Sequence, residues 1–425
     1  MRNVAREAAS VLSVIVIALA IASDAHAAEY PISDPYLATV VGTPKALLAD
    51  VPDRIPLRTR KLGVYAGRKI PKALWYGTRL EYSFARQKGR APLIFTIAGT
   101  GAYHNSPKNV FLQKVFFQAG YHVVGITSPT HPKFVIAASG TGVPGHMRQD
   151  AEDIYLVMEK IMADLGRRVD VSEFYLTGYS LGATNAAYVA QLDSERGRFN
   201  FSKVLLINPP LSVYNSISRL DRMLQNIPGG IDNFGPFFDA VMRQVSAAYK
   251  KSSTVEFSAE LIFDAFKENA PSDEELAALI GIAFRLSSAG MAYTSDVMTD
   301  FGFIKPDNVR LTKSTTMSRD MPVAMRVGFT DYFHEYFWPF NEADAGGVSR
   351  AEFARQQSLW AIQGYLIGAR HIGVFHNHDD VILEPGEIDF FAETFDNRAT
   401  IYPHGGHLGN METRKHAADM VEFFK

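Results

Sequence analysis

Short apolar runs alternate with amphipathic segments through the middle of the chain. Four runs, at 93–99, 121–129, 173–180 and 203–210, are almost continuously hydrophobic and close on glycine, serine or proline. Runs of this length and composition are typical of strands buried on both faces of a parallel sheet. The segments between them, at 106–120, 151–166 and 181–193, have the spacing and end residues of helices. The alternation predicts a mostly parallel sheet with helices on both faces.

The same pattern returns near the C-terminus. We expect a helix from 349 to about 366, a strand at 371–377, a helix at 385–395, a strand at 398–405 and a terminal helix ending at 425. Upstream, the segments 54–65 and 79–87 alternate polar and apolar residues and predict two antiparallel strands that lead into the sheet. The predicted fold class is therefore α/β.

Between 213 and 348 the strand pattern stops, and the chain predicts helices rich in phenylalanine, methionine, leucine and tyrosine. An insertion between sheet strands is typically a lid over a pocket, and we expect most of its large side chains to bury its own face. The rest should line an apolar route to the site. The side chains concerned are Phe237, Phe238, Met242, Phe263, Phe266, Phe284, Met291, Phe333, Phe337 and Trp338.

The first 27 residues have the pattern of a signal peptide. Arg2 and Arg6 precede a short apolar run at 11–22, and Ala25-His26-Ala27 is a small-x-small cleavage site. The alternative, a membrane anchor, is disfavoured because a span needs roughly 20 apolar residues. We interpret no later segment as long and apolar enough to cross a membrane. We therefore expect a mature chain beginning near Ala28, periplasmic or secreted, with peripheral association with the envelope left open.

The predicted organisation has five parts: a signal peptide (1–27), an N-terminal extension with the first strands (28–90), the first part of the core (91–212), a helical lid (213–348) and the second part of the core (349–425).

Composition narrows the chemistry. The formal net charge of −2 over 425 residues gives no electrostatic reason to expect a nucleic-acid partner. The chain has no cysteine, which excludes disulfides, a thiolate nucleophile, a cysteine-ligated metal and a bacterial lipoprotein anchor.

Gly178-Tyr179-Ser180-Leu181-Gly182 has the pattern G-x-S-x-G, placed where a predicted strand meets a predicted helix. A nucleophile at the tip of a sharp strand-to-helix turn needs small neighbours, which Gly178 and Gly182 provide. A chance occurrence of the pattern in a surface turn is the weaker interpretation, because this one stands between a strand and a small-residue helix. Ser180 is the candidate nucleophile.

A serine nucleophile needs a base and an orienting acid. His404 and His407 both lie in a glycine-rich segment after the last predicted strand, and we favour His407 because it follows the glycine pair. Asp379 and Asp380 follow the preceding predicted strand, and we favour Asp380 because three apolar residues follow it directly.

Two alternatives concern other chemistry. The segment 376–380 carries two histidines and two aspartates, as dinuclear metallohydrolases do, but a third clustered histidine is missing, so we predict no metal. Gly99-Thr100-Gly101, after the first long strand, lacks the spacing of a phosphate loop. We assign its Thr100 N–H, together with the Leu181 N–H, to the stabilisation of an oxyanion. No cofactor is expected.

These motifs, AGTGA, GYSLGA, HNHDDVIL and GGHLGN, resemble those of the α/β-hydrolase superfamily over about 93–211 and 349–425. The tail is similar to a bacterial group of secreted serine hydrolases with poorly defined substrates, some of them linked to outer-membrane lipid-asymmetry lipoproteins. The resemblance implies a lidded α/β-hydrolase fold and cofactor-free hydrolysis of an ester, thioester or amide through an acyl-enzyme. One departure is Ala98-Gly99, where His-Gly is commoner.

We therefore predict a carboxylesterase or lipase-like serine hydrolase (EC 3.1.1) that acts on a small-molecule or lipid-like ester. The alternative is a non-catalytic lipid-binding or envelope interaction protein on the same fold.

Overall fold

The computed structural model describes residues 30–224, 273–306, 311–316 and 319–425, with residues 227, 229, 233, 235–241, 243 and 309 between them. The predicted signal peptide lies outside the described residues, as do Met242, Phe263 and Phe266 of the predicted lid.

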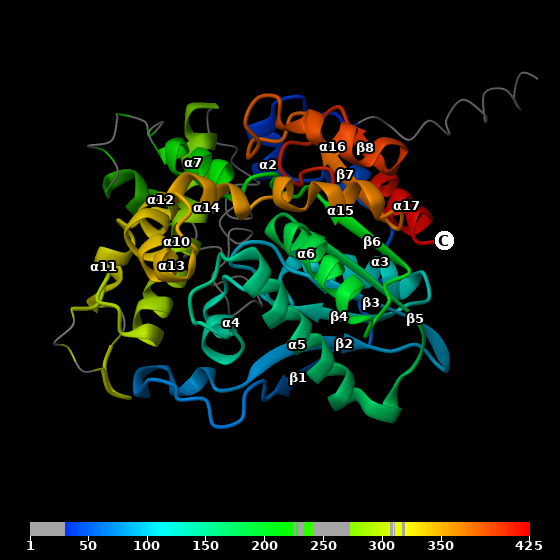
Figure 1. The fold of residues 1–425 in the computed structure, drawn as a ribbon. Helices are drawn as coiled ribbons and strands as arrows, with labels where there is room; N and C mark the ends of the chain where they lie inside the picture. Colours follow the sequence, from blue (N-terminus) through cyan, green and yellow to red (C-terminus); the bar gives the residue numbers. More distant parts are fainter. Residues whose placement is uncertain are drawn as a thin grey trace, which may run out of the picture.

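One eight-stranded sheet organises the described residues (Figure 1). Only β2 runs against the other strands, because β1 and β4 both pair with it in antiparallel register and all other pairs are parallel. The mostly parallel sheet and its antiparallel entry were both predicted and are confirmed. In spatial order the strands are β1 (Arg58–Leu62), β2 (Leu80–Ala85), β4 (His122–Ile126), β3 (Arg90–Ile97), β5 (Asp170–Tyr179), β6 (Lys203–Ile207), β7 (Ile372–Asn377) and β8 (Ala399–Tyr402).

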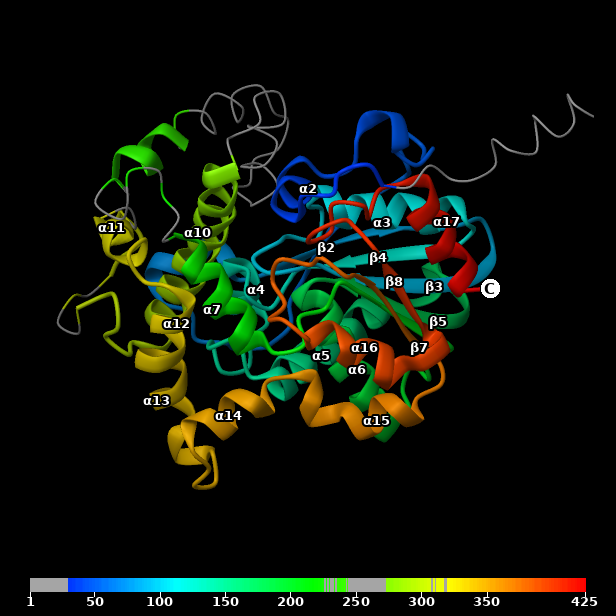
Figure 2. The ribbon, with the colours of Figure 1, turned by 90° about the horizontal axis from the view of Figure 1, so that it is seen from above.

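Alternate residues of the strands enter two different hydrophobic clusters. Leu93, Phe95 and Ile97 of β3 face one cluster and Ile94 faces the other, as the two-residue period of a strand requires. Helices cover both faces, on opposite sides of the sheet in Figure 2. The first face carries α5 (Met147–Leu165), α6 (Leu181–Arg196), α15 (Gln363–Gly368) and α16 (Glu387–Phe395), and the second carries α3 (Pro107–Gln118) and α17 (Arg414–Phe423).

This strand order, with helices on both faces and a sharp turn between β5 and α6, is the α/β-hydrolase fold. Shorter elements complete it: α2 (Pro35–Val41), α4 (Pro132–Ala137) and 3₁₀ turns at Lys45–Leu47, Lys72–Gly77, Gly166–Arg168, Leu359–Ile362 and Asp396–Arg398.

A helical insertion follows β6 and has a hydrophobic cluster of its own, beside the sheet rather than on it (Figures 1 and 2). Phe353 and Ala354, from α14 (Arg350–Gln356), join this cluster although the sequence placed them in the core. The described insertion helices are α7 (Val213–Met223), α10 (Asp273–Thr299), α11 (Met321–Ala324), α12 (Phe329–Asp331), a π-helical turn (Tyr332–Phe337), α13 (Trp338–Asn341) and a 3₁₀ turn (Glu342–Asp344).

The single helix predicted from 349 to about 366 is wrong. The structure breaks it into α14, a 3₁₀ turn and α15, with extended backbone at Ser358. Ser358 forms an isolated antiparallel bridge with Ser212 at the start of the insertion. That bridge ties the two ends of the insertion together and interrupts the helix.

The expectation that no later segment could cross a membrane is also wrong as far as length and composition go. Glu275–Thr299 in α10 has a mean hydropathy of 1.4 over its most apolar window and is long enough for a span. However, 78% of that window is buried inside the protein, against α2, α4, α7 and α11.

His416 on α17 is fully buried, with its ring against Phe375 and Tyr402. Neither ring nitrogen has a hydrogen-bond partner among the residues that the structure describes. Burial therefore lowers the pKa of His416 to about 3, and the imidazole is neutral in the folded protein.

This buried imidazole should make folding stability fall in mild acid. The unfolded chain binds the proton near pH 6.5 and the folded chain does not, so stability is full above that pH and falls toward pH 3. We expect a loss of about 2 kcal/mol at pH 5, at about 1.4 kcal/mol per pH unit. Urea unfolding at pH 7 and at pH 5 measures this loss of stability. The variant His416→Phe should lose less stability than the wild-type protein between the two pH values. Equal losses would contradict the assignment.

Candidate active site

Ser180 lies in the turn between β5 and α6 in a backbone conformation that few side chains adopt. Its φ is +54°, and its N–H donates to the Ile207 carbonyl at 2.9 Å. A Cβ on Gly178 would lie 2.2 Å from the Gly182 carbonyl oxygen, and one on Gly182 would lie 2.3 Å from the Ile97 carbonyl oxygen. Both positions therefore need glycine, and the strained turn presents the serine hydroxyl above the carboxyl end of the sheet.

His407 reaches Ser180 from the segment after β8. Its Nε2 lies 2.9 Å from the Ser180 Oγ, and its Nδ1 lies 3.1 and 3.0 Å from the two carboxylate oxygens of Asp380. All three side chains are buried. The structure thus brings together the three residues that the sequence singled out, from widely separated parts of the chain.

The environment of Asp380 keeps its carboxylate ionised. Burial alone raises the pKa of Asp380, but the charge and hydrogen bond of His407 outweigh it, helped by His376 and Asn208, and the net shift is downward. The carboxylate also accepts from the Ile382 N–H at 3.1 Å. Since an ionised carboxylate only accepts, Nδ1 of His407 carries its proton and Nε2 is free to accept from Ser180.

Asn208 is a functional residue that the sequence reasoning missed. It stands at the end of β6 with φ +46°, and its Nδ2 donates to the Asp380 Oδ2 at 2.9 Å. The sequence offered only an indirect signal, a polar residue at the end of a strand next to the nucleophile strand. Its buried amide bonds the same Asp380 oxygen that lies 3.0 Å from the His407 Nδ1.

Asp379 and His404, the alternatives to Asp380 and His407, lie in other environments. The carboxylate of Asp379 accepts from the N–H groups of Gly405 and Gly406, at 3.2 and 2.8 Å, and so caps the glycine turn. The side chain of His404 is 42% exposed and lies near Asp379 rather than near Ser180.

The histidines of the 376–380 segment are not gathered for a metal. His376 Nε2 lies 3.0 Å from the Pro209 carbonyl, and its Nδ1 accepts from the Asn377 N–H. Within the described residues, no group of three or more histidine, aspartate or glutamate side chains could hold a metal ion.

The loop after β3 stands beside the serine. A Cβ on Gly99 would lie 3.1 Å from the Ser180 Cβ. Gly101, at φ +65°, donates its N–H to the Thr130 Oγ1 at 2.8 Å, which fixes the loop. Thr100 lies between these two glycines and faces the same pocket as Ser180 and Leu181. In the part of the chain that the structure describes, the N–H groups of Thr100 and Leu181 make no hydrogen bond within the protein.

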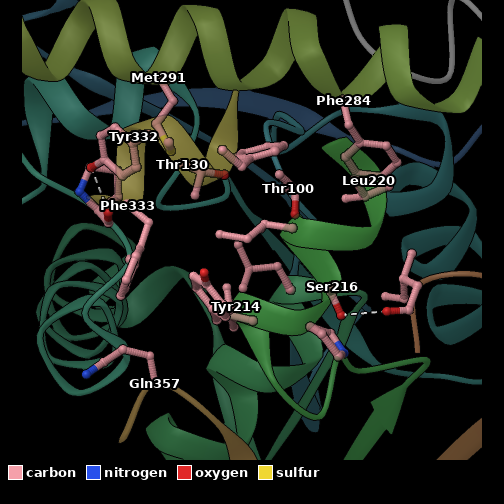
Figure 3. A pocket seen from close by; sticks show the side chains of 18 of the residues that line it. Thr100, Thr130, Tyr214, Ser216, Leu220, Phe284, Met291, Tyr332, Phe333 and Gln357 are labelled. Carbon is pink, nitrogen blue, oxygen red and sulfur yellow. Dashed lines mark hydrogen bonds between the residues drawn. The ribbon is translucent and has the colours of Figure 1, made fainter. Parts of the chain in front are cut away.

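A pocket opens beside Ser180 and His407, and Figure 3 shows many of the side chains that line it. Its walls are mostly aliphatic and aromatic side chains, and the insertion contributes Phe284, Met291, Phe333 and Phe337 among them. Three other insertion side chains that the sequence singled out belong to the insertion's own hydrophobic cluster. Trp338 is buried in this cluster, and Phe237 and Phe238 pack against the cluster.

Four polar side chains in the pocket wall already have partners in the protein. A hydroxyl or amide that is satisfied internally offers little to a ligand. The wall beyond Ser180 is therefore apolar in effect. The pairs are Tyr332 with the Pro144 carbonyl, Ser216 with the Ile382 carbonyl, Tyr214 with the His334 ring, and Gln357 with the Met147 N–H and the Phe353 carbonyl.

Comparison of the sequence with protein-family models and with curated proteins finds no match. Several solved structures match the fold at low identity. A membrane phospholipase A described as a bacterial virulence factor is 15% identical over 100% of this chain and 98% of its own, with a TM-score of 0.41. Est1E from Butyrivibrio proteoclasticus is 11% identical over 86% and 97%, with a TM-score of 0.38.

A thermostable carboxyl esterase from Bacillus coagulans is 10% identical over 87% of this chain and 98% of its own, with a TM-score of 0.42. At such identities the likeness concerns the fold alone.

The two neighbouring aspartates should differ sharply in their effect on Ser180. Asp380→Asn removes the charge that holds the His407 tautomer and should slow labelling of Ser180 by a fluorophosphonate about 10³–10⁴-fold. Asp379→Asn keeps one oxygen for the glycine turn and should slow it far less. The measurement is the second-order labelling rate constant. The reverse ranking would assign the acid to Asp379.

Proposed function

We propose that this protein is a serine hydrolase that cleaves carboxylic esters of apolar acyl chains through an acyl-enzyme intermediate. The observation that carries the proposal is the hydrogen-bonded series Ser180–His407–Asp380 at the mouth of an apolar pocket. Nucleophile, base and orienting acid are within hydrogen-bond reach in the order that acyl transfer requires.

In the first half of the reaction, the Ser180 Oγ attacks the ester carbonyl carbon while its proton passes to His407 Nε2. Asp380 stabilises the imidazolium that forms. As the tetrahedral intermediate collapses, the bond to the alcohol oxygen breaks and His407 returns the proton to that oxygen. In the second half, water attacks the acyl-enzyme and gives its proton to His407, which then protonates Ser180 as the acid leaves.

The negative charge of the tetrahedral intermediate needs donors that are fixed in advance. Among the described residues, the N–H groups of Leu181 and Thr100 make no hydrogen bond within the protein, and the loop that carries Thr100 is held by the bond from the Gly101 N–H to Thr130. A donor of this kind typically lowers the barrier by about 3–4 kcal/mol. These two groups are our candidates for the oxyanion hole.

The pocket supports an apolar acyl group. Four of its polar side chains are occupied by partners in the protein, so binding rests chiefly on contact with aliphatic and aromatic side chains. Each buried methylene contributes up to about 0.8 kcal/mol. The insertion, which supplies much of this wall, acts in this proposal as a lid over the acyl group.

The alternative, a lipid-binding protein without catalysis, would use the same pocket. It gives no reason for the strained conformation of Ser180 or for the buried Asp380 carboxylate that is hydrogen-bonded to His407, both of which cost stability. We also propose, from the pattern of residues 1–27 alone, that the protein is exported to the periplasm or the medium.

Loss of either end of the proton relay should abolish the reaction. We expect Ser180→Ala and His407→Ala each to remove nearly all turnover of p-nitrophenyl esters, because these residues act as a unit. His404→Ala is the matched control and should keep most activity, since its side chain lies away from Ser180. Wild-type protein that neither turns over such esters nor labels at Ser180 would refute the proposal.

Specificity should rise with acyl length until the pocket is full. The measurement is kcat/KM for p-nitrophenyl esters from acetyl to palmitoyl, below the concentration at which they form micelles. Ile217 lines the pocket, so Ile217→Trp should shift the optimum to shorter chains. Val323→Trp, at an exposed position on α11, should leave the optimum unchanged. A strict preference for acetyl would contradict the apolar-acyl assignment and leave the serine-hydrolase proposal intact.

A further inference from the structure

The short helix α2 lies between the segment that carries His407 and the insertion helix α10 (Figure 2). It is a well-formed element despite its length. Pro35 occupies the first turn, where its missing N–H costs nothing, and the Asp34 carboxylate caps the helix by accepting from the Leu37 N–H at 2.6 Å. It begins soon after the predicted cleavage site near Ala28.

One face of α2 is in direct contact with the histidine segment. The His407 N–H donates to the Thr39 Oγ1 at 2.8 Å, and the Thr39 hydroxyl donates in turn to the Pro35 carbonyl at 2.7 Å. The backbones also touch, since a Cβ on Gly406 would lie 2.2 Å from the Pro35 carbonyl oxygen. A Cβ on Gly409 would lie 2.2 Å from the Ala38 carbonyl oxygen.

The histidine segment needs such support because its backbone is strained. Gly405, Gly406 and Leu408 have φ values of +152°, +53° and +66°. Leu408 has a side chain in this unfavourable region, a conformation that persists only where its surroundings hold it. From the β7 side the segment is held by Asp379 and by Asn377, whose Nδ2 donates to the Gly406 carbonyl at 2.8 Å. On the other side α2 holds it.

We propose that Thr39 is a positioning residue for His407. This inference rests on the proposed function, because it assigns to Thr39 the placement of the general base. Thr39 is 5% exposed and does not line the acyl pocket. Its hydroxyl joins the His407 backbone to the first turn of α2, a role that needs an atom able to accept and to donate at once.

The other face of α2 extends the argument to the insertion. Val40 is buried in the insertion's hydrophobic cluster, and Tyr36 and Leu37 pack against it. The helix that holds the base is thereby anchored on the structure that forms the pocket wall. Displacing Thr39 relative to His407 should therefore alter the rate of the chemical step without altering the pocket itself.

Thr39→Val keeps the shape of the side chain and removes its hydrogen bonds. We expect kcat for p-nitrophenyl butyrate to fall about 10²-fold, the order of loss that follows a misplacement of about 1 Å at a reacting group. KM should change little, because the pocket wall is intact. Labelling of Ser180 by a fluorophosphonate should slow by the same factor as kcat, and Thr39→Ser, which keeps the hydroxyl, should restore both.

Thr43→Val is the matched control. The Thr43 hydroxyl donates to the Gly409 carbonyl at 2.7 Å, so it links the same two segments without contacting the backbone of His407. Loss of this hydroxyl should lower thermal stability about as much as Thr39→Val does. It should lower kcat far less than Thr39→Val does. If Thr39→Val does not fold, Thr39→Ala replaces it in the same comparison.

The outcomes separate this inference from the proposed function. The positioning role would be overturned if kcat fell no more in Thr39→Val than in Thr43→Val, or if Thr39→Ser did not restore it. Turnover by the wild-type protein would still support the hydrolase proposal in that case. Absence of wild-type labelling at Ser180 would instead overturn the proposed function.

Discussion

The strained turn at Ser180 is the constraint on which the rest of the site depends. A non-glycine residue at φ +54° costs of order 1–3 kcal/mol and has to be held by its surroundings. Here the hold comes from the Ser180 N–H bond to β6 and from the close approach of Gly178 and Gly182 to neighbouring backbone. The same features that make the turn costly place the Ser180 hydroxyl within 2.9 Å of the His407 Nε2, in the pocket that Thr100 and Leu181 also line.

Convergence follows from the parallel sheet. The carboxyl ends of β3, β5, β6, β7 and β8 lie along one edge, and each is followed by one component of the site. The loop after β3 carries Thr100, β5 carries the serine, β6 ends at Asn208, and the segments after β7 and β8 carry Asp380 and His407. Residues that are far apart in the sequence therefore become neighbours, because each lies close to the end of its own strand.

The sequence was informative where chemistry and local pattern coincide. G-x-S-x-G at a strand end, and a histidine and an aspartate at the next expected strand ends, are short-range signals, so the fold and the three central residues could be predicted. Thr39 and Asn208 could not, because a threonine in a short helix and an asparagine after a strand have many ordinary roles. Their contacts with Asp380 and His407 arise only when β6 and α2 pack against segments that are distant in the sequence.

The same limit explains the two errors in reading the elements. A β-bridge between Ser212 and Ser358 breaks a stretch whose local pattern is helical throughout, and no local signal records a partner so far away. In α10, hydropathy alone does not distinguish a helix that crosses a bilayer from one enclosed by its own protein. The surrounding α2, α4 and α7 make that distinction.

Helix α10 also bears on how the insertion could act as a lid. It supplies Phe284 and Met291 to the pocket, and a Cβ on Gly101 would lie 2.7 Å from its Ser287 Oγ, so it lies directly over the loop that carries Thr100. Its contact with α2 connects it to the support of His407 as well. Moving α10 away as a unit would expose a largely buried apolar helix and release two loops that the reaction needs in place. Its contacts on two sides therefore make α10 a firmly held wall of the pocket beside Ser180.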